Sequence, residues 1–362
     1  MAKQFLALVE EAARGTNPGA GFKFLPLRSG LQPKFQPKDE PRKEFRGQDT
    51  ALGDASVRRL SSAWNNTLEL NAYPGAERGL LLKHALGFAG VRAVLDTSAY
   101  KGILYPIAMP YGLGAGLGDT AVGLIANTDE EGTTKSQYWG GGRIRSWSRS
   151  IKADEDVVDS FELGGPGPYV GAVDQAETAG AAFPAATPFL YSDAKFYIGA
   201  GISRTGVAPN FTDVGAGTMV QFQPDEFNMK VSLGLEDKTV LNGVQGPSKT
   251  HRNAQASIEC DFTIDYRDPA SGFSSADEFK ATFSGPRTNS LLVVLESSEL
   301  AGAATAKYTE IMDFPLMLLS SDGPERDNEG KTAPVKLSWK ALLNSTVGYP
   351  FALITIDKAS AY

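Results

Sequence analysis

Alternation of apolar and polar residues with a period of two is the feature that most constrains this chain. It is clearest from Ser257 to Tyr266 and recurs in Asn66–Tyr73 and Phe227–Leu235. One face of the first stretch carries Ile258, Cys260, Phe262, Ile264 and Tyr266, and the other carries Ser257, Glu259, Asp261, Thr263 and Asp265. This pattern is typical of half-buried antiparallel strands. We therefore predict a mainly β fold in which Cys260 is a small core residue.

Further strands are predicted at Arg143–Ile151, 291–295, 308–319, 335–339 and 351–356. The first of these is a weaker signal, because Trp147 and Ile151 share a face with arginines while the serines share a face with Ile144. Pro315 assigns part of the 308–319 strand to a sheet edge or a bulge. The chain holds 39 glycines and 21 prolines, which favours many turns over long helices.

Three short helices are predicted. Residues 3–14 place Phe5, Leu8, Val9 and Ala12 at helical spacing ahead of Gly15. A second helix is expected at 77–86, ended by Gly87, and a third at 275–284, ended by Gly285.

The stretches between these elements are rich in polar residues, glycine and proline. Residues 15–60 are predicted to be loop with brief strands, and residues 34–46 to be either a mobile loop or an arm that orders on a partner. Residues 164–188 are rich in Gly, Ala and Pro and suggest a linker or surface excursion.

One order of events occurs twice, about 190 residues apart: strand, polar loop, strand, turn and short helix. The polar loops are 33–57 and 238–256. We predict two tandem β domains, 16–185 and 186–362, after an N-terminal helix or arm at 1–15. The alternative is that a β-rich chain shows such a repeated order of elements without any duplication.

The residues that usually carry chemistry are scarce. One cysteine and two distant histidines exclude disulfides within the chain and Cys-based metal sites, and the net charge of −7 disfavours a general nucleic-acid binder. The glycine run 112–118 lacks a following helix, so it is a weak nucleotide-binding motif. Asp154–Asp156 with Asp159 is interpreted as a charged hairpin turn, and His84 as a packed or capping residue. We expect no enzyme activity, cofactor or metal.

Targeting signals are also missing from the pattern. The apolar run near Met1 is too short for a signal-peptide core, and no run approaches the ~20 apolar residues of a membrane helix. The sequence favours a protein made and folded in a cytoplasm.

Several segments, taken in order, resemble the tail tube proteins of long-tailed bacteriophages. The resemblance rests on Trp64–Gly87 (WNNTLELNAYPGAERGLLLKHALG), Tyr138–Gly164, Pro188–Gly199, Phe227–Glu236 and Ser257–Asp265. It covers most of the chain after about residue 55. Segments 90–135 and 164–187 depart from it and are interpreted as insertions.

This resemblance implies two tandem antiparallel β-sandwich or barrel domains of tail-tube type, each with a short flanking helix. It implies a structural subunit of stacked rings around a channel that conducts DNA during genome ejection, without catalytic residues. The partners would be copies of the chain, other tail proteins and DNA passing non-specifically. The location would be the virion tail after assembly in the host cytoplasm. Two such domains per chain favour a trimeric ring with pseudo-sixfold symmetry, with a hexamer as the alternative.

The polar faces of two alternating strands are the candidate lining of such a channel, although the outward assignment is nearly as good. These candidate lumen residues are Thr67, Glu69, Asn71, Glu259, Asp261, Thr263 and Asp265. A second function class stays open: a soluble β-rich carbohydrate-binding or carbohydrate-active protein. In that case the tryptophans would line a sugar cleft: Trp64, Trp139, Trp147 and Trp339.

Overall fold

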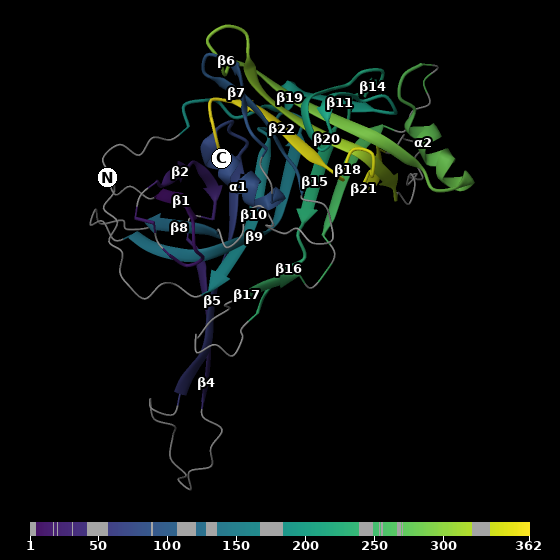
Figure 1. The fold of residues 1–362 in the computed structure, drawn as a ribbon. Helices are drawn as coiled ribbons and strands as arrows, with labels where there is room; N and C mark the ends of the chain where they lie inside the picture. Colours follow the sequence, from purple (N-terminus) through teal and green to yellow (C-terminus); the bar gives the residue numbers. More distant parts are fainter. Residues whose placement is uncertain are drawn as a thin grey trace.

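The computed structural model is mainly β, with two short α-helices among the residues it describes (Figure 1). Those residues are 5–16, 18–19, 21–30, 32–41, 57–87, 90–106, 121–127, 136–166, 184–238, 249–252, 254, 256–265, 269, 271–320 and 334–362. The helices are α1 (Ala76–Leu86) and α2 (Ser275–Ala281), and two 3-10 turns are η2 (Tyr191–Asp193) and η3 (Thr282–Ser284).

A long antiparallel sheet, here called the central sheet, runs through the molecule. In spatial order its strands are β4 (Lys34–Pro41), β5 (Val57–Asn71), β10 (Val158–Pro166), β9 (Ser136–Lys152), β15 (Glu226–Ser232), β18 (Ser257–Asp265), β21 (Pro334–Ala341) and β20 (Lys307–Leu319). The short strand β3 (Leu27–Ser29) also pairs with β5. The pairing of β9 with β15 joins the N-terminal part of the chain to the C-terminal part.

Two further groups of strands branch from the long strands β9 and β20. The first is β2 (Lys23–Leu25), β1 (Phe5–Glu11) and β8 (Ala121–Asn127), which reaches the beginning of β9. The second is β14 (Val220–Phe222), β11 (Ala194–Ile198) and β19 (Thr288–Leu300), which reaches β20. The other edge of β20 continues into β22 (Ala352–Asp357), β7 (Ala99–Leu104) and β6 (Ala93–Asp96).

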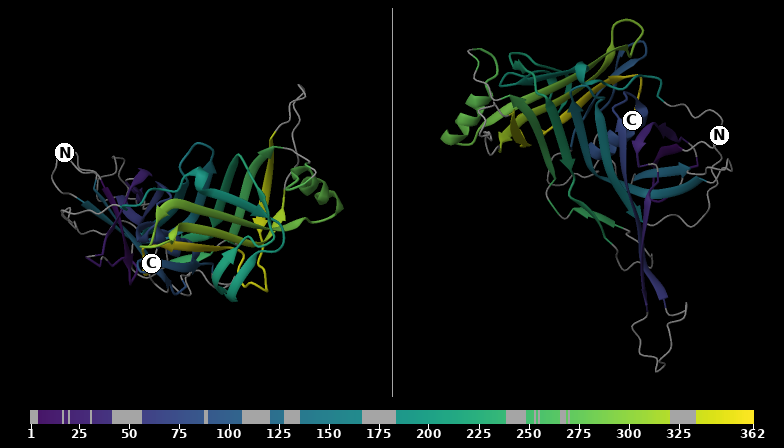
Figure 2. Two further views of the ribbon diagram at one scale, coloured as in Figure 1. Left: turned by 90° about the horizontal axis from the view of Figure 1, so that it is seen from above. Right: turned by 180° about the vertical axis from the view of Figure 1, so that it is seen from behind.

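Two small hairpins complete the described strands, β12 (Ser203–Val207) with β13 (Asn210–Gly215), and β16 (Leu235–Lys238) with β17 (Lys249–Arg252). Figures 1 and 2 show the β4–β5 hairpin projecting far from the body, with β16 and β17 on the same side.

The same order of strand pairing occurs twice. In the N-terminal half it is β2-β1-β8-β9-β10-β5-β4, and in the C-terminal half β14-β11-β19-β20-β21-β18-β15. A register shift also recurs at the equivalent pairing of the two halves. It lies between Val122 and Leu124 where β8 pairs with β9, and between Asn289 and Leu291 where β19 pairs with β20. Pro315 lies at the second shift, which confirms the predicted bulge.

The core lies between the central sheet and the two branching groups. Phe196 and Phe222 of the second group contact Phe227 and Phe262 of the central sheet, with ring centroids 5.4 and 4.9 Å apart. All four tryptophans and Cys260 are buried. The prediction for Cys260 is confirmed, whereas the tryptophans do not line a sugar cleft.

The predicted strands and the helices at 77–86 and 275–284 are confirmed, but the helix at 3–14 is wrong. Residues 5–11 form β1, a strand between β2 and β8 with Leu6, Ala7, Leu8 and Val9 all buried. Burial on both faces of this strand removes the alternation of apolar and polar residues, and the remaining apolar spacing fits a helix equally well.

Three other segments contain strands where a loop or an insertion was predicted. The polar loop 33–57 contributes β4, and 238–256 contributes β17 with the end of β16. Segment 90–135, interpreted as an insertion, contributes β6, β7 and β8. The glycine run 112–118 and residues 167–183 of the predicted linker lie outside the described residues.

Candidate functional site

One face of the central sheet carries mostly polar side chains, and we call it the polar face. The registers align them in rows that cross the strands in the order β5, β10, β9, β15, β18 and β21. The three best-filled rows are Thr67–Glu162–Ser146–Ser232–Ser257, then Glu69–Ser160–Ser148–Lys230–Glu259–Lys340, and then Asn71–Val158–Ser150–Asn228–Asp261–Ser338. The residues between them on each strand are buried on the opposite side.

All seven candidate lumen residues lie on this polar face. Three come from β5 and four from β18, and the strands β10, β9 and β15 stand between them. A pocket of about 400 Å³ spans this interval, and its lining includes Glu69, Ser148, Ser160, Lys230, Glu259 and Asp261. The two predicted patches are thus parts of one continuous surface.

Sequence analysis missed the middle of this surface. Ser146, Ser148 and Ser150 come from β9, and Ser160 from β10. The alternation of serines in Arg143–Ile151 was visible, but the arginines on the other side of the strand obscured which face was solvated.

Acidic groups on the polar face are interspersed with lysines that partly neutralise them. Lys336 Nζ lies 2.8 Å from Asp261 Oδ2, and Lys152 Nζ lies 3.1 Å from Glu226 Oε1. The amide of Asn228 and then Lys152 lower the pKa of Glu226, since both stabilise its charged form. Small polar groups and charges of both signs give a hydrated surface, with no cysteine or histidine in the rows described.

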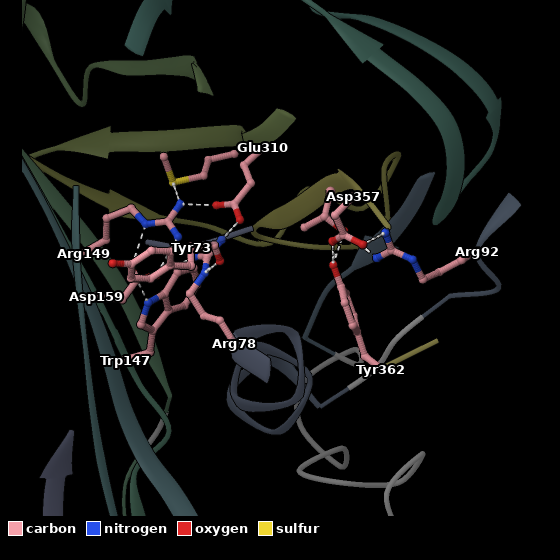
Figure 3. Close-up of polar contacts among 11 residues, drawn as sticks. Tyr73, Arg78, Arg92, Trp147, Arg149, Asp159, Glu310, Asp357 and Tyr362 are labelled. Atoms are coloured by element: carbon pink, nitrogen blue, oxygen red, sulfur yellow. Dashed lines mark hydrogen bonds and ion pairs between the residues drawn. The ribbon is translucent and has the colours of Figure 1, made fainter. Parts of the chain in front are cut away.

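A cluster of charged side chains lies directly beneath the polar face, inside the core (Figure 3). Arg149 of β9 makes a two-point contact with Asp159 of β10, at 2.8 and 2.9 Å, and its other nitrogen lies 2.9 Å from Glu310 of β20. Arg78 of α1 donates to Asp159 at 2.6 Å and also pairs with Glu310. The four side chains are almost fully buried, and within the cluster the two positive charges compensate the two negative ones.

This cluster corrects the interpretation of Asp159 as part of a surface turn. Only Asp154–Asp156 form the turn, while Asp159 lies inside β10 opposite Arg149. Burial alone would raise the pKa of Asp159, but the charges of Arg149 and Arg78 lower it to about 2. His84 is packed as predicted, with its Nε2 3.1 Å from Glu10 Oε1.

A second buried group lies farther along the core (Figure 3). Arg92 Nη2 is 2.9 Å from Asp357 Oδ1, and the Arg92 guanidinium stacks 4.2 Å from the centre of the Tyr362 ring. The Tyr362 hydroxyl donates to Asp357. Both groups join parts of the chain that are distant in the sequence, which indicates a structural role.

The described residues contain no group of three or more His, Cys, Asp or Glu side chains placed to hold a metal ion. In the same part of the chain, none of the helices has the length and apolar character needed to cross a membrane. Comparison with protein-family models and with curated proteins finds no match to this sequence.

Proposed function

We propose that this chain is the structural subunit of a phage tail tube, and that its polar face lines a channel for DNA. The observation that carries the proposal is the continuous polar face, which crosses strands of both halves of the chain. Serines and carboxylates along a channel would offer the phosphates of DNA no attractive contact, and Lys336 and Lys152 of this face are paired with Asp261 and Glu226, so that DNA would slide.

The recurring order of strand pairing supports two tail-tube-like domains in one chain. The proposed boundary stays between residues 185 and 186. Because β1 pairs with β2 and β8, the first domain would include β1 in place of the predicted N-terminal helix or arm.

The contact between the two halves offers a template for ring closure. Strand β15 of the second half pairs with β9 of the first. In the recurring order β4 holds the position of β15, and among the described strands β4 pairs only with β5. We propose that β4 of one chain extends the second half of its neighbour in the same way, so that three chains close a ring of six domains.

The two projecting hairpins, β4–β5 and β16–β17, extend from the same side of the molecule (Figure 2). In stacked rings they would reach the next ring. This gives the two polar loops, 33–57 and 238–256, a role in stacking, although parts of them are already strands in a single chain.

The experiment is to purify the protein and to measure its mass by light scattering and its shape by negative-stain imaging. We expect rings or tubes whose end-on averages show six densities built from three chains. Six separate chains per layer would contradict the trimer, and a protein that stays monomeric at all concentrations would contradict the tube function.

A further inference from the structure

The two α-helices occupy equivalent places in the recurring order but differ sharply in burial. Helix α1 follows β5, and α2 follows β18. Eight of the 11 residues of α1 are buried. In α2, Ser275, Ala276 and Glu278 are buried, while Asp277 and Lys280 are exposed.

Helix α1 packs against β2 and β9 of its own half, and the second half of the chain covers another part of it. Arg78 pairs with Glu310 of β20, and Lys83 Nζ donates to the Tyr362 carbonyl at 2.9 Å. Gly79 lies so close to the Tyr362 ring that a methyl group at this position would overlap it. The second half therefore completes the burial of the helix of the first half.

Helix α2 has a different setting. Figures 1 and 2 show it at the end of the molecule that is remote from the first half. The adjoining η3 turn carries Phe283, which is 75% exposed and has its ring in an edge contact with Phe279, with centroids 5.1 Å apart. The two neighbouring rings give the outer side of α2 and η3 an apolar surface.

We infer that the surface of Phe279, Lys280 and Phe283 on α2 and η3 docks against the first half of a second copy of this chain. The contact of α1 with Glu310 and Tyr362 of the second half is the intrachain counterpart of this interface. The inference rests on the proposed ring and adds to it the residues that bury the second helix.

Two single substitutions compare this surface with an equally exposed apolar site. Phe283→Asp places a charge in the proposed interface. Val207→Asp is the matched control, because Val207 is 81% exposed at the β12–β13 hairpin. We expect both variants to keep the wild-type circular dichroism and melting temperature. We expect at least tenfold weaker self-association for Phe283→Asp and less than twofold change for Val207→Asp. Equal self-association of the three proteins would overturn the inference.

A photo-crosslinking phenylalanine analogue at position 283 of the full chain identifies what covers it. We expect crosslinked peptides from residues 5–166 of a second copy, and crosslinks only between residues 186–362 would overturn the inference. If the wild type forms small oligomers with the expected crosslinks but no rings, the interface stands and the tube function fails. If rings form and position 283 yields no crosslink between chains, the tube function stands and the interface fails. A wild type that never self-associates contradicts both.

Discussion

At the residue scale, the buried charges show how a polar residue can belong to the core of a β protein. Arg149 and Asp159 lie opposite each other on neighbouring strands, and each is fully buried. A buried charge is tolerated only when it is paired and hydrogen-bonded. Arg78 of helix α1 and Glu310 of strand β20 complete that pairing. The cluster therefore couples α1, the central sheet and the second half of the chain.

Replacing Arg149 should reveal this coupling. Arg149→Met leaves two buried carboxylates with one arginine, so we expect a loss of about 3–5 kcal/mol in the free energy of unfolding. Lys307→Met removes one partner of the exposed Lys307–Glu296 pair, 3.0 Å apart, and should cost less than about 1 kcal/mol. Urea unfolding of both variants and the wild type measures the difference. Similar losses in the two variants would contradict a structural role for the cluster.

The same residues show why part of the site could not be predicted from sequence. The polar residues of β5 and β18 alternate with apolar ones, so their face was evident from the period of two. In β9 the core-facing positions include Arg149, and the pattern has no apolar face from which to choose. Only the register that places Asp159 opposite Arg149 resolves this, and register depends on contacts that are distant in the sequence.

At the element scale, the sequence predicted correctly the ends of helices that a neighbouring residue determines. Gly87 has φ 92° and ends α1, as its position after the apolar helix indicated. The helix predicted at 3–14 is wrong because tertiary pairing with β2 and β8 determines the conformation of β1. The recurring pairing order was foreseen only as an order of elements, since strand neighbours are not encoded locally.

The contact between β1 and α1 predicts a dependence of stability on pH. Glu10 of β1 lies 2.9 Å from Lys83 and 3.1 Å from His84 of α1. The hydrogen bond with His84, followed by the one with Lys83, stabilises the charged form of Glu10 more than burial destabilises it. The pKa of Glu10 is therefore lowered from 4.5 to about 2. A lowered folded-state pKa contributes stability above the unfolded-state value, and this contribution is lost as pH falls from about 4.5 toward about 2.

Glu10→Gln removes that contribution, so it should destabilise the protein at pH 6 and differ little from the wild type near pH 2. Chemical unfolding across this range measures the difference between the two proteins. Glu296→Gln, which removes an exposed carboxylate, is the control for general charge effects. A gap between wild type and Glu10→Gln that stays constant with pH would rule out the Glu10 contact as its source.

At the whole-molecule scale, the proposed tube makes the sign of charge on the polar face decisive. Glu69→Lys combined with Glu259→Lys reverses two carboxylates on that face. Asp213→Lys combined with Glu296→Lys changes the net charge equally on strands β13 and β19, away from the polar face. Lysines that face DNA phosphates release counterions and bind DNA strongly at low salt. We expect assembled Glu69→Lys/Glu259→Lys to retain a short DNA duplex at least tenfold more tightly than the wild type, with an affinity that falls steeply as salt rises. The control pair should change retention by less than about threefold, because its charges would lie outside the channel. Equal retention by both double variants would show that the polar face does not line a channel.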